Sequence, residues 1–233
     1  MIRVALFAVC MIAWVGSASG QRKVESDTGS HIAIPQRARI PDAPGLTVDD
    51  RARIAMAEFA RCTVDRRAIA MRRVLSLPIE KLDGSVWMPL ADTECLASGE
   101  MRFQPRIMRG ALFSELVRRR AVETARGGAW TFPVMPYDAV ALADPANRVT
   151  QLDAALLAFA DCVVKRDPVG AQAVIVAPTA TEAESVAIAA LAPNLGPCLP
   201  AGQTIKLSRS ILEGAVAEIL YRVPVQPVVA ETK

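Results

Sequence analysis

Four cysteines carry the most definite chemistry in this sequence. Cys62 precedes Cys95, and Cys162 precedes Cys198, each time by just over thirty residues. A metal site would need clustered ligands such as Cys-x-x-Cys or neighbouring histidines, and the sequence has neither around these positions. The fifth cysteine, Cys10, lies inside an apolar N-terminal run. Removal of this run as a signal peptide would leave four cysteines, and an even number of cysteines in an exported chain favours disulfide bonds.

The cysteines belong to a pattern that occurs twice, with offsets of 100 at the first cysteine, 103 at the second and 104 at a following glycine. Four cysteines allow three pairings, but duplication of one bridged ancestor predicts Cys62–Cys95 and Cys162–Cys198. Each bridge is expected to contribute about 3–4 kcal/mol to stability. The first copy reads Phe59-Ala-Arg-Cys62, Cys95-Leu-Ala-Ser-Gly99 and Gly110-Ala-Leu-Phe-Ser-Glu115; the second reads Phe159-Ala-Asp-Cys162, Cys198-Leu-Pro-Ala-Gly202 and Gly214-Ala-Val-Ala-Glu218.

Arginines in the first copy form a second group with possible chemistry. Residues 48–127 hold fifteen Lys/Arg against eleven Asp/Glu, whereas residues 145–223 hold six against seven. Arginine binds anions through two parallel hydrogen bonds, which suits an anionic lipid, a polyanionic glycan or an acidic protein surface. The alternative is a solvated face whose side-chain stems cover apolar surface. The candidate anion-binding residues are Arg66, Arg67, Arg72, Arg73, Arg106 and Arg109.

Catalytic templates are mostly missing from the sequence. His31 is the only histidine and lies in the lead-in, so Ser–His–Asp and Cys–His arrangements are excluded from the rest of the chain. No glycine-rich phosphate loop is present, and we expect no cofactor and no metal. Glu115 and Glu218 are interpreted as equivalent helix positions that form salt bridges, although paired carboxylates leave a hydrolase as an alternative. The net charge of +3 is too small to indicate a nucleic-acid partner.

The elements that position these residues are predicted to be helices, giving a mostly α fold with two disulfide-stapled units and only short extended segments, near 101–103 and 204–207. Thr47 and Asp50 predict a capping box for the first helix. Ser210 and Glu213 resemble a second capping box, at the start of the last helix. Gly110 and Gly214 stand inside apolar helices, where glycine costs roughly 1 kcal/mol against alanine. Their recurrence predicts close backbone approach to a neighbouring element, such as the cysteine-bearing helix.

The chain divides by composition into six segments. Arg3, an apolar run and the small residues before Gln21 are typical of a secretory signal peptide. A proline-punctuated lead-in follows it, and a linker with three aromatic residues, expected to pack against the units, joins the two copies. No transmembrane segment is expected in the mature chain. The segments are a signal peptide at 1–20, a flexible lead-in at 21–46, the first unit at 47–126, the linker at 127–147, the second unit at 148–223 and a tail at 224–233.

The leader, the alanine-rich composition and the duplicated Phe-Ala-x-Cys, Cys-Leu-x-x-Gly and Gly-Ala pattern resemble small exported proteins of alpha-proteobacteria, particularly sphingomonad-like bacteria. The resemblance covers residues 48–222 and implies an envelope location, periplasmic or secreted, without an activity or site residues. The leading interpretation is a non-enzymatic binding or interaction protein, with an anionic ligand or an envelope protein as partner. The alternatives are an envelope hydrolase that uses carboxylates and a structural or assembly protein.

Overall fold

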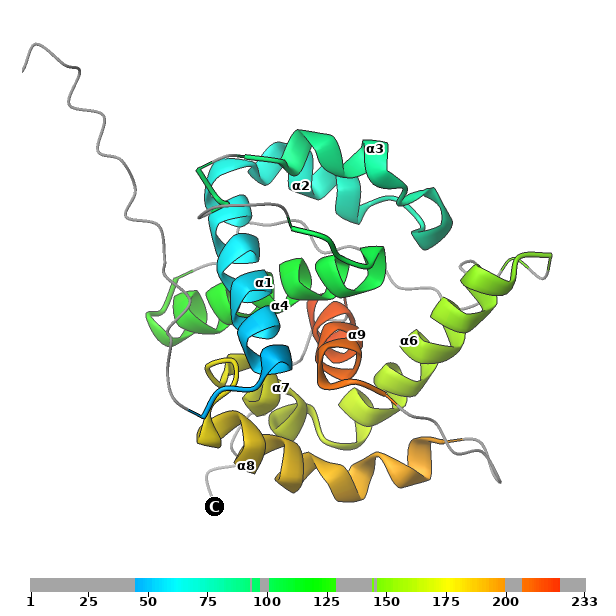
Figure 1. The fold of residues 1–233 in the computed structure, drawn as a ribbon. Helices are drawn as coiled ribbons and strands as arrows, with labels where there is room; N and C mark the ends of the chain where they lie inside the picture. The colour runs from blue at the N-terminus through cyan, green and yellow to red at the C-terminus, as the bar shows by residue number, and fades with distance from the viewer. Residues whose placement is uncertain are drawn as a thin grey trace, which may run out of the picture. The chain divides into compact units, whose positions relative to one another are not determined.

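The computed structural model describes residues 45–92, 94–96, 101–128, 144, 146–199 and 207–222 (Figure 1). By their contacts these residues all belong to one unit, residues 36–233. The predicted signal peptide, all but the end of the lead-in, the aromatic part of the linker and the tail lie outside the described residues. So does most of the second predicted extended segment.

Within the described residues the chain forms eight α-helices and no strand, which confirms the mostly α prediction. The first half has α1 (Val48–Arg66), α2 (Ala68–Leu75), α3 (Gly84–Trp87) and α4 (Pro105–Ala125). The second half has α6 (Arg148–Arg166), α7 (Pro168–Val176), α8 (Glu182–Leu191) and α9 (Arg209–Arg222). Short 3-10 turns join them: η1 (Ile79–Lys81), η2 (Met88–Leu90), η3 (Ala192–Asn194) and η4 (Gly196–Cys198).

Local sequence signals set several of the helix ends. The predicted capping box is present at α1, where the Thr47 side chain accepts a 3.0 Å hydrogen bond from the Asp50 backbone N–H. The second predicted capping box is wrong. Ser208, not Ser210, caps α9 and accepts a hydrogen bond from the backbone N–H of Ile211 at 3.3 Å. Glu213 is consequently available for a tertiary contact.

Both predicted disulfides are present and tie each long first helix to a segment farther along the chain. Cys62 of α1 bonds to Cys95 with a Cα–Cα distance of 5.5 Å. Cys162 of α6 bonds to Cys198 of η4 with a Cα–Cα distance of 5.7 Å. Both distances lie in the usual range for disulfides. The fold therefore contains one staple in each half, as the spacing of the cysteines predicts.

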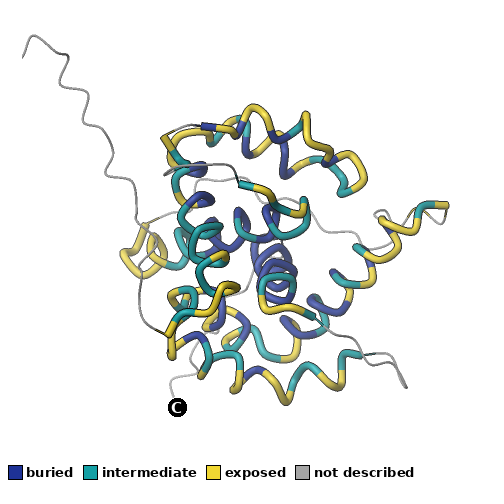
Figure 2. The backbone as a smooth tube through the Cα atoms, in the orientation of Figure 1, coloured by how far each residue is buried: buried dark blue, intermediate teal, exposed yellow. Residues whose placement is uncertain are grey.

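The centre of the structure is the crossing of α4 and α9, one helix from each half (Figures 1 and 2). α9 is buried from Leu212 to its last residue, and α4 also contributes large core side chains such as Phe113. Around this pair, α1 packs on α4, α6 packs on α9, and α7 contacts both central helices. The two halves therefore share one hydrophobic core.

Gly110 and Gly214 allow the two central helices to approach each other. A Cβ added at Gly110 would lie 2.5 Å from the Cα of Gly214, and one added at Gly214 would lie 2.7 Å from the Cα of Gly110. Neither position therefore has room for a methyl group. The predicted close approach is present, but the partner of each glycine is the other glycine and not a cysteine-bearing helix.

Candidate functional site

The first four of the six candidate anion-binding arginines lie around α2. Arg66 and Arg67, at the junction of α1 and α2, both bind the buried carboxylate of Asp92, with Nε–Oδ2 distances of 3.1 and 3.2 Å. Arg72 and Arg73 lie on the exposed face of α2. In this part of the predicted site, Arg66 and Arg67 bind a carboxylate of the chain, and Arg72 and Arg73 lie next to them on the surface.

The remaining two, Arg106 and Arg109 of α4, point into the protein and bind Glu218 of α9. Arg106 NH1 lies 2.6 Å from Oε2, and Arg109 NH2 lies 2.9 Å from Oε1. Arg222 NH2 adds a third contact, 2.8 Å from Oε1. Arg106 NH1 also contacts Asp153 of α6 at 3.1 Å. This Glu218 cluster joins α4, α6 and α9 inside the protein.

The balance of charge in the Glu218 cluster favours the ionised carboxylate. Glu218 is fully buried, and burial alone would raise its pKa. The charges of Arg109, Arg106 and Arg222 outweigh burial and hold the pKa of Glu218 well below its usual range. The carboxylate is therefore fully compensated by groups of the chain itself.

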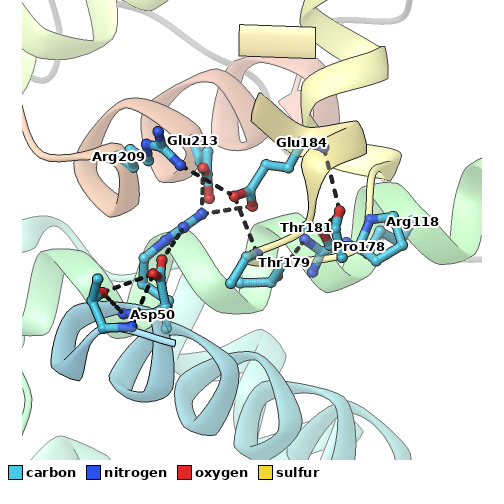
Figure 3. A network of polar contacts seen from close by, with 11 residues as sticks. Asp50, Arg118, Pro178, Thr179, Thr181, Glu184, Arg209 and Glu213 are labelled. Atoms are coloured by element: carbon cyan, nitrogen blue, oxygen red, sulfur yellow. Dashed lines mark hydrogen bonds and ion pairs between the residues drawn. The ribbon is translucent and has the colours of Figure 1, made fainter. Parts of the chain in front are cut away.

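A second buried cluster is centred on Arg53 of α1 and joins it to α8 and α9 (Figure 3). Arg53 NH2 donates to Glu184 Oε1 at 2.6 Å and to Glu213 Oε1 at 2.7 Å. Its NH1 lies 3.5 Å from Asp50 Oδ1. Arg209 NH1 approaches Glu184 Oε2 at 3.9 Å. We call these five residues the Arg53 cluster.

Here the carboxylates are less well compensated than at Glu218. Burial raises the pKa of Glu213, Arg53 lowers it, and the neighbouring Glu184 raises it again, so that the pKa lies above its usual range. Arg118 of α4 is a more distant positive charge, because its own hydrogen bonds go to the Ile175 carbonyl at 2.7 Å and to Thr179 Oγ1 at 3.2 Å. Glu213 consequently holds a proton more readily than an ordinary glutamate.

The backbone beside the Arg53 cluster has an unusual conformation. Ala180 has a φ of 61°, in the left-handed region that residues with a side chain rarely adopt. Its N–H donates to Glu184 Oε2 at 3.1 Å. Thr181 caps α8 directly afterwards and accepts a hydrogen bond from the Glu184 backbone N–H at 3.3 Å. The strained residue thus helps to fix the Glu184 carboxylate against Arg53.

A groove of about 700 Å³ opens next to this cluster, where α1, α4 and α9 all begin. The side chain of Gln104, the N-cap of α4, makes no capping hydrogen bond. Helix starts carry partial positive charge and unpaired N–H groups, which favours anions. The groove is lined by the basic residues Arg53, Arg102 and Arg209, the acidic Asp49 and Asp50, the polar Thr47, Gln104, Ser208 and Ser210, and the apolar Ala52, Met56, Phe103 and Ile107.

A smaller cavity of about 40 Å³ lies beside the groove and shares part of its wall. Its polar lining comes from both halves of the chain and includes Glu213, Ser114, Arg118 and Thr179. Its other wall is made by the close crossing of the central helices at Gly110. The lining residues common to the groove and this inner cavity are Arg53, Met56, Ile107 and Ser210.

The sequence alone does not mark Arg53, Glu184 or Glu213 as site residues. One signal was available in the predicted repeat, where Arg53 aligns with Asp153 at the offset of 100 and Glu213 aligns with Arg109 at the offset of 104. Charges of opposite sign at aligned buried positions indicate that the two halves build different clusters. Glu115 is not the equivalent of Glu218, because it stands five residues after its glycine and Glu218 four after its own. Glu115 binds Arg119 instead, at 2.7 Å.

The fold and site define an all-α, disulfide-stapled protein with a polar groove at converging helix starts. Comparisons with protein-family models, with curated proteins and with solved structures gave no match. None of the described helices is both long and apolar enough to cross a membrane. Within the same residues, no group of three His, Cys, Asp or Glu side chains is arranged to hold a metal ion.

Proposed function

We propose that the protein is an exported binding protein whose groove takes a small ligand with an anionic group and an apolar part. The observation that carries this proposal is the groove itself, because its volume of about 700 Å³ is typical of small-molecule sites. Its lining combines three arginines with an apolar surface that includes Met56 and Phe103. Two disulfides fit an oxidising compartment, and the signal-peptide pattern of residues 1–20 supports export.

The anionic group is expected at the starts of α4 and α9, whose first turns line both the groove and the inner cavity through Ile107 and Ser210. The two acidic lining residues, Asp49 and Asp50, both come from the first turn of α1. Asp50 is already engaged, since it binds Thr47 and contacts Arg53. Arg102 and Arg209 lie at the other two helix starts, where the helix dipoles add positive potential. The ligand's charge would therefore lie toward α4 and α9.

Glu184 and Glu213 are not placed as the acid and base of a hydrolase. An acid and a base that act on one substrate must both reach it. Glu213 lines the inner cavity, but Glu184 is fully buried and lines neither the groove nor that cavity. Both carboxylates also bind the same guanidinium nitrogen of Arg53.

The test compares two fluorescent probes with the same aromatic body, one anionic (8-anilinonaphthalene-1-sulfonate) and one neutral (N-phenyl-1-naphthylamine). We expect saturable one-to-one binding of the sulfonate, tighter than that of the neutral probe. Arg209→Glu should weaken sulfonate binding about tenfold, equivalent to about 1.4 kcal/mol. Arg73→Glu is the matched control, because Arg73 is an exposed arginine of α2 outside the groove lining.

Equal binding of both probes, or an equal loss of affinity in the two variants, would contradict the proposal. Melting temperatures of the two variants close to that of the wild type would show that the comparison concerns the groove and not folding.

A further inference from the structure

Glu213 has no role in the binding described so far, although it lies where a ligand in the groove would end. It lines the inner cavity, which shares Arg53 and Ser210 with the groove. A volume of about 40 Å³ has room for two or three water molecules or for one carboxyl group, since a single water needs about 10–15 Å³. The head of a ligand whose body occupies the groove can therefore reach this carboxylate.

Arg53, which lines the inner cavity, has hydrogen-bond donors that the protein itself does not use. Arg53 Nε and NH1 are buried and, within the described part of the chain, form no hydrogen bond, although NH1 has its 3.5 Å contact with Asp50. Buried donors of this kind are normally satisfied by the protein, by water or by a ligand. Ser210 adds a hydroxyl at the same place. Neither of these two Arg53 nitrogens is exposed to the cavity, so the polar contact with an arriving anion falls to Ser210 and to the Glu213 carboxyl group.

The charges around Glu213 leave no surplus for a second anion. α1 contributes Arg53 and Asp50, α4 contributes Arg118, α8 contributes Glu184, and α9 contributes Arg209. With Glu213 ionised, positive and negative charges in this set are equal. A bound carboxylate would add an unpaired negative charge next to two buried carboxylates, which is costly. Protonation of Glu213 removes the negative charge of its own carboxylate, which restores the balance, and makes Glu213 a hydrogen-bond donor.

We infer that the ligand of the groove is a carboxylic acid, whose carboxylate binds in the inner cavity and accepts a hydrogen bond from protonated Glu213. This inference rests on the proposed function. One proton enters from solvent with each ligand, is held on Glu213 and leaves when the ligand dissociates. A carboxylate suits this contact because its basicity matches that of Glu213, and hydrogen bonds to ionised acceptors are short and strong. Burial, which already raises the pKa of Glu213, favours the protonated form.

The test measures binding of 1-naphthoate by isothermal titration calorimetry, at several pH values between 5 and 8 and in buffers of different ionisation enthalpy. The probe stays ionised over this range, because carboxyl groups titrate near pH 4. Uptake of up to one proton is expected in the wild type, and affinity should fall by up to tenfold per pH unit as the pH rises. Glu213→Gln should abolish both effects. Glu115→Gln is the matched control, because Glu115 lies outside both cavity linings, and it should keep them.

The outcomes separate this inference from the proposed function. If 8-anilinonaphthalene-1-sulfonate binds through Arg209 but 1-naphthoate binds without proton uptake, the inference is wrong and the groove remains a binding site. Proton uptake that persists in Glu213→Gln also overturns the inference. If neither anion binds, the proposed function fails together with it. The wild-type proton count needs no variant, so a folding defect in Glu213→Gln would not prevent the test.

Discussion

Helix α9 carries two buried glutamates, Glu213 and Glu218, whose surroundings differ in the number of arginines that bind the carboxylate directly. Glu218 binds three arginines, and its pKa is lowered. Glu213 shares one guanidinium nitrogen with Glu184, and its pKa is raised. Only Glu213 lines the inner cavity beside the groove. The comparison separates a carboxylate that is fully compensated within the fold from an under-compensated one next to a cavity, where we propose that a ligand binds.

The largest expected effect comes from neutralising Glu218. Glu218→Gln removes the carboxylate that Arg106, Arg109 and Arg222 share, although Arg106 keeps its contact with Asp153, and loss of one partner of a buried ion pair costs about 3–5 kcal/mol. Glu213→Gln should change the free energy of unfolding by less than about 1 kcal/mol, because loss of the contact with Arg53 is offset by relief from burying a carboxylate whose pKa is raised. Urea denaturation at pH 7 measures both. Similar losses for the two variants would remove the distinction between the clusters.

The next effect concerns the crossing of α4 and α9 at Gly110 and Gly214. Gly110→Ala and Gly214→Ala each add a methyl group within 3 Å of backbone, and overpacking of this kind typically costs about 1–3 kcal/mol. Gly196→Ala is the control, because nothing lies within 4 Å of a Cβ at that position. If the central substitutions are as mild as the control in thermal denaturation, the helices do not approach as closely as described.

The two glutamates should contribute with opposite signs to the pH dependence of the free energy of unfolding. A carboxyl with a lowered pKa stabilises the fold above its unfolded pKa, near 4.3, and this stability is lost as the pH falls. A carboxyl with a raised pKa does the opposite, because ionising it as the pH rises above 4.3 penalises the folded state. The free energy of unfolding, measured from pH 3 to pH 8, should therefore flatten on the acid side in Glu218→Gln. In Glu213→Gln the free energy of unfolding should rise relative to the wild-type value as the pH approaches 8. If both variants change the pH dependence of stability in the same direction, the assignment of a lowered pKa to Glu218 and a raised pKa to Glu213 is wrong.

The smallest expected effect is at Ala180, next to the Arg53 cluster. Its φ of 61° is unfavourable for alanine and readily adopted by glycine. Ala180→Gly should stabilise the protein by up to about 1 kcal/mol, because relief of strain exceeds the added flexibility of the unfolded chain. The change should be visible as a small rise in melting temperature. A fall in melting temperature would show that the alanine side chain makes a contact that outweighs the strain.

The elements of the fold were predictable because their signals are local. Thr47 and Asp50 predict the start of α1, and the recurring cysteine spacing predicts both disulfides. Gly110 and Gly214 predicted a close approach but not its partner, since a glycine shows only that space is needed. Ser210 was assigned as a cap because its spacing to Glu213 fits the motif, yet Ser208 occupies that position.

The site could not be predicted in the same way, because its residues meet only through tertiary packing. Arg53 is 131 residues from Glu184 and 160 residues from Glu213. Arg106 and Arg109 were predicted to bind an external anion, but the sequence could not show that both bind Glu218 inside the protein. Charge density along the chain indicated an exposed basic face, whereas packing determines which arginines remain exposed.

The most direct test is a carbon-13 NMR titration of the glutamate side-chain carboxyls, with assignments from Glu213→Gln and Glu218→Gln. The account predicts that Glu213 titrates above the ordinary glutamate range and that Glu218 stays ionised to the lowest pH at which the protein is folded. Addition of 1-naphthoate at neutral pH should shift the Glu213 signal to the protonated position and leave Glu218 unchanged. Titration of both carboxyls near the ordinary value of 4.3 would contradict the account.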